Sequence, residues 1–127
     1  MKLTSRQRAF FGTFGYLVVR QLLSPSRVER VIEAFEWSIQ TWGGGEGHDG
    51  SKRTMFGGAI EHAPELCALL DHPGIVDLIG GVAGDDFNYC GGDGNYYIGD
   101  TQWHPDDNWG RPFATKTTFY LDELRRD

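Results

Sequence analysis

Residues 101–106 carry the sequence TQWHPD, in which β-forming residues predict a strand. Residues two positions apart on a strand point to the same face, so His104 and Asp106 can converge on one metal ion. A histidine and a carboxylate supply two of the three ligands in the two-histidine, one-carboxylate arrangement that holds non-haem Fe(II). The alternative is a polar turn before Asp107, in which both side chains bond to the backbone.

The residues on either side of this motif also predict β-structure. Residues 87–90 and 95–98 flank the glycine-rich turn at 91–94, an arrangement typical of a hairpin. Phe113–Leu121 gives the clearest strand pattern, because large or β-branched residues recur at every second position. The C-terminal part therefore predicts an antiparallel sheet.

The N-terminal half predicts helices instead. Thr4 and Gln7 have the spacing of a capping box, and Ser24 followed by Pro25 is typical of a helix start. The helix that begins at Pro25 should end at the glycines at 43–45. Its apolar residues recur at helical spacing and predict one buried face, formed by Val28, Val31, Ile32, Phe35, Ile39 and Trp42.

The remaining segments of this half are shorter. A β-run is predicted at Tyr16–Val19, and Pro64 and Pro73 predict short helices over Glu65–Leu70 and Gly74–Val82. Residues 43–58 predict a polar, glycine-rich loop. Its polar side chains have two interpretations, a solvated loop or a role in substrate recognition, and they include His48, Lys52 and Arg53.

Helices followed by strands predict an α+β fold, with the N-terminal helices packed on an antiparallel sheet in a single domain over residues 1–127. Four or five strands are predicted, whereas a jelly roll needs eight. The sheet is therefore expected to be an unfinished part of a larger β-architecture.

Composition excludes several functional classes. Twelve Lys and Arg residues against eighteen Asp and Glu residues give a net charge of -6, which argues against nucleic acid as a partner. No apolar run approaches the roughly 18 residues that span a bilayer, so no membrane partner is expected. These features predict a soluble, cytoplasmic protein.

Four segments, in this order and spacing, resemble the phytanoyl-CoA dioxygenase family of Fe(II)/2-oxoglutarate-dependent oxygenases. The segments are Phe11–Val19, His72–Gly80, the metal motif Gln102–Asp106 and Tyr120–Glu123. The resemblance implies a double-stranded β-helix, a jelly-roll or cupin-like scaffold. It also implies a hydroxylase that uses Fe(II), 2-oxoglutarate and O2 to oxidise a small-molecule substrate.

The resemblance also implies roles for individual residues. His104 and Asp106 correspond to the first two iron ligands, and the carboxylate at 106 favours hydroxylation over halogenation. Trp109 and Arg111 follow in a loop that borders the active site in relatives, where they could contact substrate or simply pack the loop.

Three further polar residues are candidates for holding 2-oxoglutarate. They lie on or beside the predicted strands, where ordinary polar sheet surface is the alternative, and they are Gln102, Lys116 and Thr118.

The sequence departs from the family in one respect. The family continues from the Tyr120–Glu123 strand to a second iron histidine and an arginine that binds 2-oxoglutarate, whereas this sequence ends at Asp127. The other histidines, at 48, 62 and 72, precede the motif and match no family ligand. We therefore expect the N-terminal portion of an oxygenase, incomplete as a catalyst.

Two other classes of function stay open. One is a non-catalytic interaction module on a partial jelly-roll scaffold, which could form a homo-oligomer through an unpaired sheet edge at Phe113–Leu121. The other is a small-ligand or carbohydrate-binding β-domain, which would leave the His104 and Asp106 pair unexplained.

Overall fold

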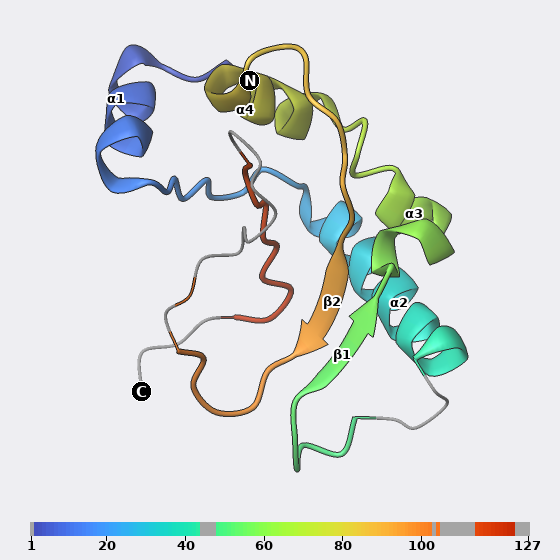
Figure 1. Cartoon of the computed structure of the whole chain (residues 1–127). Coiled ribbons are helices and arrows are strands. Elements are labelled where there is room, and N and C mark those ends of the chain that lie inside the picture. The colour runs from blue at the N-terminus through green and yellow to red at the C-terminus, as the bar shows by residue number, and fades with distance from the viewer. Residues whose placement is uncertain (1, 44–47, 103, 105–113, 124–127) are drawn as a thin grey trace.

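The computed structural model describes residues 2–43, 48–102, 104 and 114–123 of the chain. These residues are mostly helical, with a small two-stranded antiparallel sheet (Figure 1). None of the helices in this part of the chain combines the length and apolar composition that crossing a bilayer requires. In chain order the elements are α1 (Ser5–Phe14), α2 (Pro25–Trp42), β1 (Thr54–Gly57), the 3-10 helix η1 (Ala59–His62), α3 (Pro64–Cys67), α4 (Pro73–Ala83) and β2 (Asp93–Tyr96).

The predicted helix starts are confirmed. At α1 the Thr4 hydroxyl accepts from the Gln7 backbone N–H at 3.2 Å, and the Gln7 side chain accepts from the Thr4 N–H at 2.9 Å. This reciprocal pair satisfies backbone donors that a helix end leaves unbonded. At α2 the Ser24 hydroxyl accepts from the Arg27 N–H at 3.3 Å, and Pro25 occupies the first turn.

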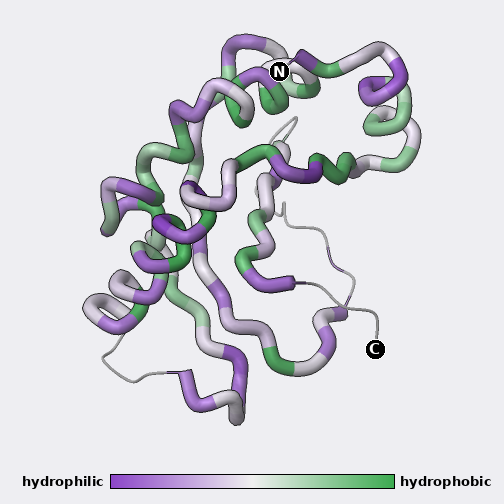
Figure 2. The backbone as a smooth tube through the Cα atoms, turned by 180° about the vertical axis from the view of Figure 1, so that it is seen from behind, coloured by the Kyte–Doolittle hydropathy of each residue, from purple (hydrophilic) through white to green (hydrophobic). Residues whose placement is uncertain are grey.

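Helix α2 carries the core. Hydrophobic and hydrophilic residues alternate along it (Figure 2), and Val31, Phe35 and Ile39 are buried on one face. Trp42, which the same pattern predicted to be buried, is 56% exposed and stacks on His62. The other buried members of the core cluster come from β1, η1, α3 and α4 and the segments that join them: Phe56, Ala59, Ala63, Leu66, Leu69 and Ile75.

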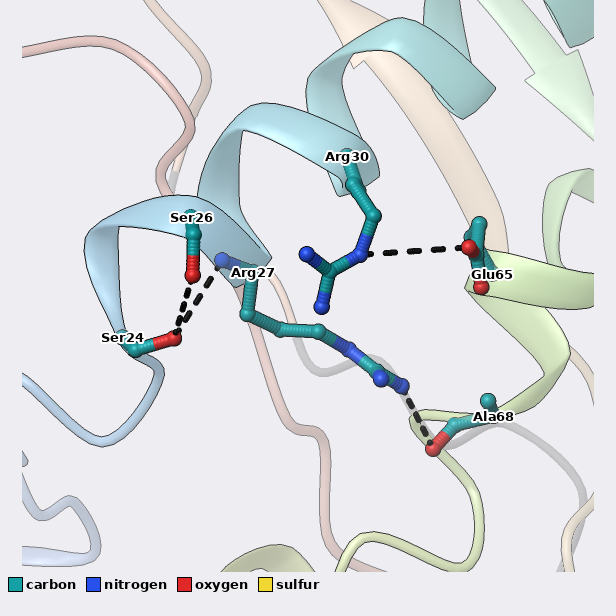
Figure 3. A network of polar contacts seen from close by, with 6 residues as sticks. All are labelled: Ser24, Ser26, Arg27, Arg30, Glu65 and Ala68. Carbon is teal, nitrogen blue, oxygen red and sulfur yellow. Dashed lines mark hydrogen bonds and ion pairs between the residues drawn. The ribbon is translucent and has the colours of Figure 1, made fainter.

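A polar network fixes the first turns of α2 against α3 (Figure 3). The Arg27 guanidinium donates to the Ala68 carbonyl at 3.3 Å, and Arg30 Nε lies 3.9 Å from the Glu65 carboxylate. The Arg30–Glu65 pair is nearly half exposed on both sides, so it adds little to stability. The helix start is therefore held mainly by its cap and by the core beneath it.

The sheet pairs two segments that are distant in sequence. In the antiparallel register Phe56 lies opposite Gly94, and Thr54 lies opposite Tyr96. Phe56 and Tyr96 face the core, whereas Met55, which directly precedes Phe56 and points to the other face of the sheet, is 62% exposed. The prediction for residues 43–58 was therefore wrong at 54–57, which form β1 and not a loop.

The other strand predictions also need correction. Strand β2 includes half of the predicted 91–94 turn and pairs with β1, so the predicted 87–98 hairpin does not form. No strand occurs at 16–19, at 101–102, at His104 or at 114–121. The other residues of the predicted 101–106 and 113–121 strands lie outside the described residues. A strand needs a neighbour to accept its backbone hydrogen bonds, and none of these segments has one among the described residues.

The α+β prediction is thus confirmed only in its coarse form. The described residues form helices and a two-stranded sheet, and they do not form a jelly roll or double-stranded β-helix. Part of the 113–121 pattern survives without a strand, because Phe119 and Leu121 are half-buried and pack on the core while Thr118 and Tyr120 are exposed. The period-two pattern therefore holds only at 118–121, because Thr115 and Thr117, which it placed on the same face as Phe119, are exposed.

Candidate functional site

His104 is exposed, and its imidazole is oriented by the backbone. Its Nδ1 atom lies 2.7 Å from the Gln102 carbonyl oxygen. A carbonyl can only accept, so Nδ1 carries the proton and donates. In the neutral ring the lone pair is then on Nε2, the arrangement that metal-binding histidines commonly have.

The other predicted site residues are only partly covered by the structure. Asp106, Trp109 and Arg111 lie outside the described residues. Gln102 contributes its carbonyl to His104, and its side chain, like those of Lys116 and Thr118, is exposed. Among the described residues, no three histidine, cysteine, aspartate or glutamate side chains form a group that could hold a metal ion.

A second polar cluster, which no sequence motif marks, lies where α2 meets β2. The Tyr96 hydroxyl donates a hydrogen bond to Glu36, and the His48 ring stacks on Tyr96 with centroids 4.4 Å apart and an interplanar angle of 11°. His48 Nδ1 lies 3.0 Å from the hydroxyl of Thr54, the strand partner of Tyr96. The Tyr96 ring also packs on Phe35, with 5.5 Å between centroids and 53° between the ring planes.

This cluster lines a pocket of about 310 Å³. One turn of α2 supplies Glu36, Ile39 and Gln40, whose spacing places them on one side of the helix, and His48 and Tyr96 complete the lining. Burial, followed by the hydrogen bond to Glu36 and its negative charge, raises the pKa of the Tyr96 phenol above its ordinary value. The phenol therefore stays protonated and remains a donor to the carboxylate.

The opposite face of the sheet carries a separate contact. Arg53 donates from Nε and Nη2 to the Asn95 side-chain oxygen at 2.9 and 2.7 Å, and its guanidinium lies 4.5 Å from the Tyr97 ring centroid. Met55 of β1 is also near the guanidinium, with its sulfur 3.8 Å from Arg53 Nη2. These contacts brace the strand pair across its exposed face.

Two tyrosines bonded to carboxylates predict a decline of stability in alkali. The pKa of Tyr96 is raised, as described above. The Tyr89 hydroxyl lies 3.3 Å from the Glu61 carboxylate, and burial and the charge of Glu61 raise the pKa of Tyr89 to about 12. An unfolded tyrosine ionises near pH 10. A raised folded-state pKa gives stability that is complete below about pH 10 and lost as the pH rises through the folded values, because only the unfolded chain ionises readily.

Urea unfolding at about pH 9 and about pH 11 measures this effect. We expect the free energy of unfolding to be lower at the higher pH, and Tyr96→Phe to lose part of that difference. The substitution itself should cost about 1 kcal/mol at neutral pH, because water in the pocket can solvate Glu36 once the phenol is gone. An identical pH dependence in the variant would show that Tyr96 does not contribute.

Comparison of the chain with protein-family models, with curated proteins and with solved structures finds no match. The interpretation of the site therefore rests on the residues themselves.

Proposed function

We propose that this chain supplies the first iron-binding motif of a cytoplasmic Fe(II)/2-oxoglutarate-dependent hydroxylase of the phytanoyl-CoA dioxygenase type. The observation that supports the proposal is the hydrogen bond from His104 Nδ1 to the Gln102 carbonyl, which leaves the lone pair of the neutral ring on Nε2. The polar-turn alternative also expects a bond from this side chain to the backbone, so the metal titration described below separates the two. Asp106, two residues further on, would be the carboxylate ligand.

The proposal includes the jelly-roll scaffold and the 2-oxoglutarate contacts that the sequence resemblance implies. Gln102, Lys116 and Thr118 are the candidates for orienting the co-substrate, and Trp109 and Arg111 for contacting the small-molecule substrate. Bound iron and 2-oxoglutarate would supply the oxidative chemistry with O2, while the chain would hold the metal and orient the two organic molecules.

An anaerobic titration of the chain with Fe(II) and 2-oxoglutarate tests the proposal. We expect the visible charge-transfer band of the chelate to form in the wild type and to be lost in His104→Ala and Asp106→Ala. Apparent iron affinity should fall at least about tenfold in each, because even the loss of a group that only orients a ligand typically costs that much.

His62→Ala is the matched control, because His62 is an exposed histidine that stacks on Trp42 and lies outside the motif. It should leave the band and the iron affinity unchanged. A band that persists in His104→Ala, or that never forms in the wild type, would contradict the assignment of the motif as a metal site in this chain.

The second candidate, an interaction module that forms a homo-oligomer, is favoured by a different observation. Within the described residues β1 and β2 pair only with each other, so each strand has one unpaired backbone edge. This function predicts concentration-dependent self-association in light scattering and no dependence of that association on His104.

A further inference from the structure

Three side chains of the pocket, Glu36, His48 and Tyr96, are held by contacts with other residues before any ligand enters. The Tyr96 ring stacks on His48 and also contacts Phe35, and its hydroxyl is bonded to Glu36. The His48 ring is held in turn by Thr54. Side chains fixed in this way lose little conformational freedom on binding, which favours a specific small-molecule site over an adaptable surface.

The pocket lining contains one acidic side chain, Glu36. Among the described residues, no basic nitrogen lies within 4.0 Å of the Glu36 carboxylate. Asp122 also lies close enough for its charge to raise the pKa of Tyr96, so a second carboxylate adds to the field at the phenol. The Tyr96 hydroxyl donates to one carboxylate oxygen of Glu36. The second side-chain acceptor that α2 contributes to the pocket is the amide oxygen of Gln40.

The size and lining of the pocket restrict the ligand further. A volume of about 310 Å³ is near the lower end of the range for small-molecule sites, roughly 300–1,000 Å³. Ile39 supplies an apolar surface between the two polar residues of α2. A short aliphatic stem would lie on Ile39 while a cationic head with several donors reaches the carboxylate and the amide.

We propose that this pocket binds a small protonated amine, with Glu36 as its counter-ion, Gln40 as a hydrogen-bond acceptor and Ile39 as the contact for its aliphatic stem. A divalent cation fits less well, because the pocket offers Glu36 and His48 but lacks a third histidine, cysteine or acidic side chain among the described residues. The site is independent of the proposed iron motif.

An NMR titration of the full chain with propylammonium chloride, without added metal, tests the proposal. A ligand this small should bind with a Kd of about millimolar order, and the Gln40 side-chain amide signal should shift. Propanol, which matches the shape without the charge, should produce no saturable shift. Glu36→Gln should weaken propylammonium binding roughly tenfold or more, because it removes a charge-assisted hydrogen bond.

The controls separate the site from general attraction to an acidic protein. Glu33→Gln, on an exposed position of the same helix, should change the affinity less than about twofold because its charge is solvated. Gln40→Lys, also at an exposed position, should abolish binding without disturbing the core, and Gln40→Glu should strengthen it.

Three results would overturn the proposal. The first is the absence of saturable binding in the wild type. The second is equal binding by the wild type and the correctly folded Glu36→Gln variant. The third is tighter binding of MgCl2 or ZnCl2 that shifts the same signals and excludes the amine, which would make the pocket a metal site.

Discussion

Phe35→Ala should lower the free energy of unfolding by about 3–5 kcal/mol, the usual cost of removing a buried aromatic side chain. Phe35 is 8% exposed and links helix α2 to the sheet, because it packs against Tyr96 and Gly94 of β2. Small domains have a total stability of about 5–15 kcal/mol, so the loss would be a large part of the whole. Urea unfolding monitored by circular dichroism measures it.

Phe14→Ala is the matched control, because Phe14 is 60% exposed at the end of α1. It should change stability by about 0.5 kcal/mol or less. Similar losses in both variants would show that the core does not depend on Phe35 as the structure indicates. The Phe35 variant should also weaken amine binding, since Tyr96 loses a ring on which it packs.

The helices could be predicted from the sequence because their determinants are local. Ser24 caps a backbone N–H three residues further on, and Pro25 lies in the first turn, where its missing N–H costs no hydrogen bond. Thr4 likewise bonds to a residue three positions away. These signals hold whatever the rest of the chain does. Burial of Val31, Phe35 and Ile39 followed from the same short-range periodicity.

The sheet could not be predicted in the same way, because its pairing is not local. Residues 54–57 are flanked by glycines and polar residues that are typical of a loop, and they become a strand only because β2 lies alongside. Gly94 was predicted as part of a turn, but it is in β2, where its missing side chain makes room for Phe35. The sequence cannot show that Gly94 lies against the Phe35 ring, because the two residues are distant along the chain.

The two candidate sites differ in the same way, because one is local in sequence and the other is not. The His104 and Asp106 pair is a sequence motif because both residues lie within three positions, whereas Glu36 and Tyr96 are 60 positions apart and form no motif. Only the packing of α2 on the sheet brings that pair together. A helix position that carries a carboxylate beside the apolar face is the one signal at Glu36, and solvated glutamates share it.

Gly94→Ala should destabilise the protein by about 1–3 kcal/mol, although it adds a single methyl group. A Cβ atom at position 94 would lie well inside contact distance of Cε2 of Phe35. The Phe35 ring cannot swing away freely, because it is buried and packs against Tyr96. Either the ring or strand β2 must shift, and both movements disturb the wall of the pocket.

Gly57→Ala is the control, because Gly57 lies in the partner strand and a Cβ there would meet nothing within 4 Å. It should be neutral or slightly stabilising, since alanine loses less backbone freedom than glycine on folding. Combining Gly94→Ala with Phe35→Leu should recover part of the loss, with a coupling of about 0.5–3 kcal/mol in a double-mutant cycle. Strict additivity would contradict the contact between Phe35 and Gly94, because two residues that touch cannot be changed independently.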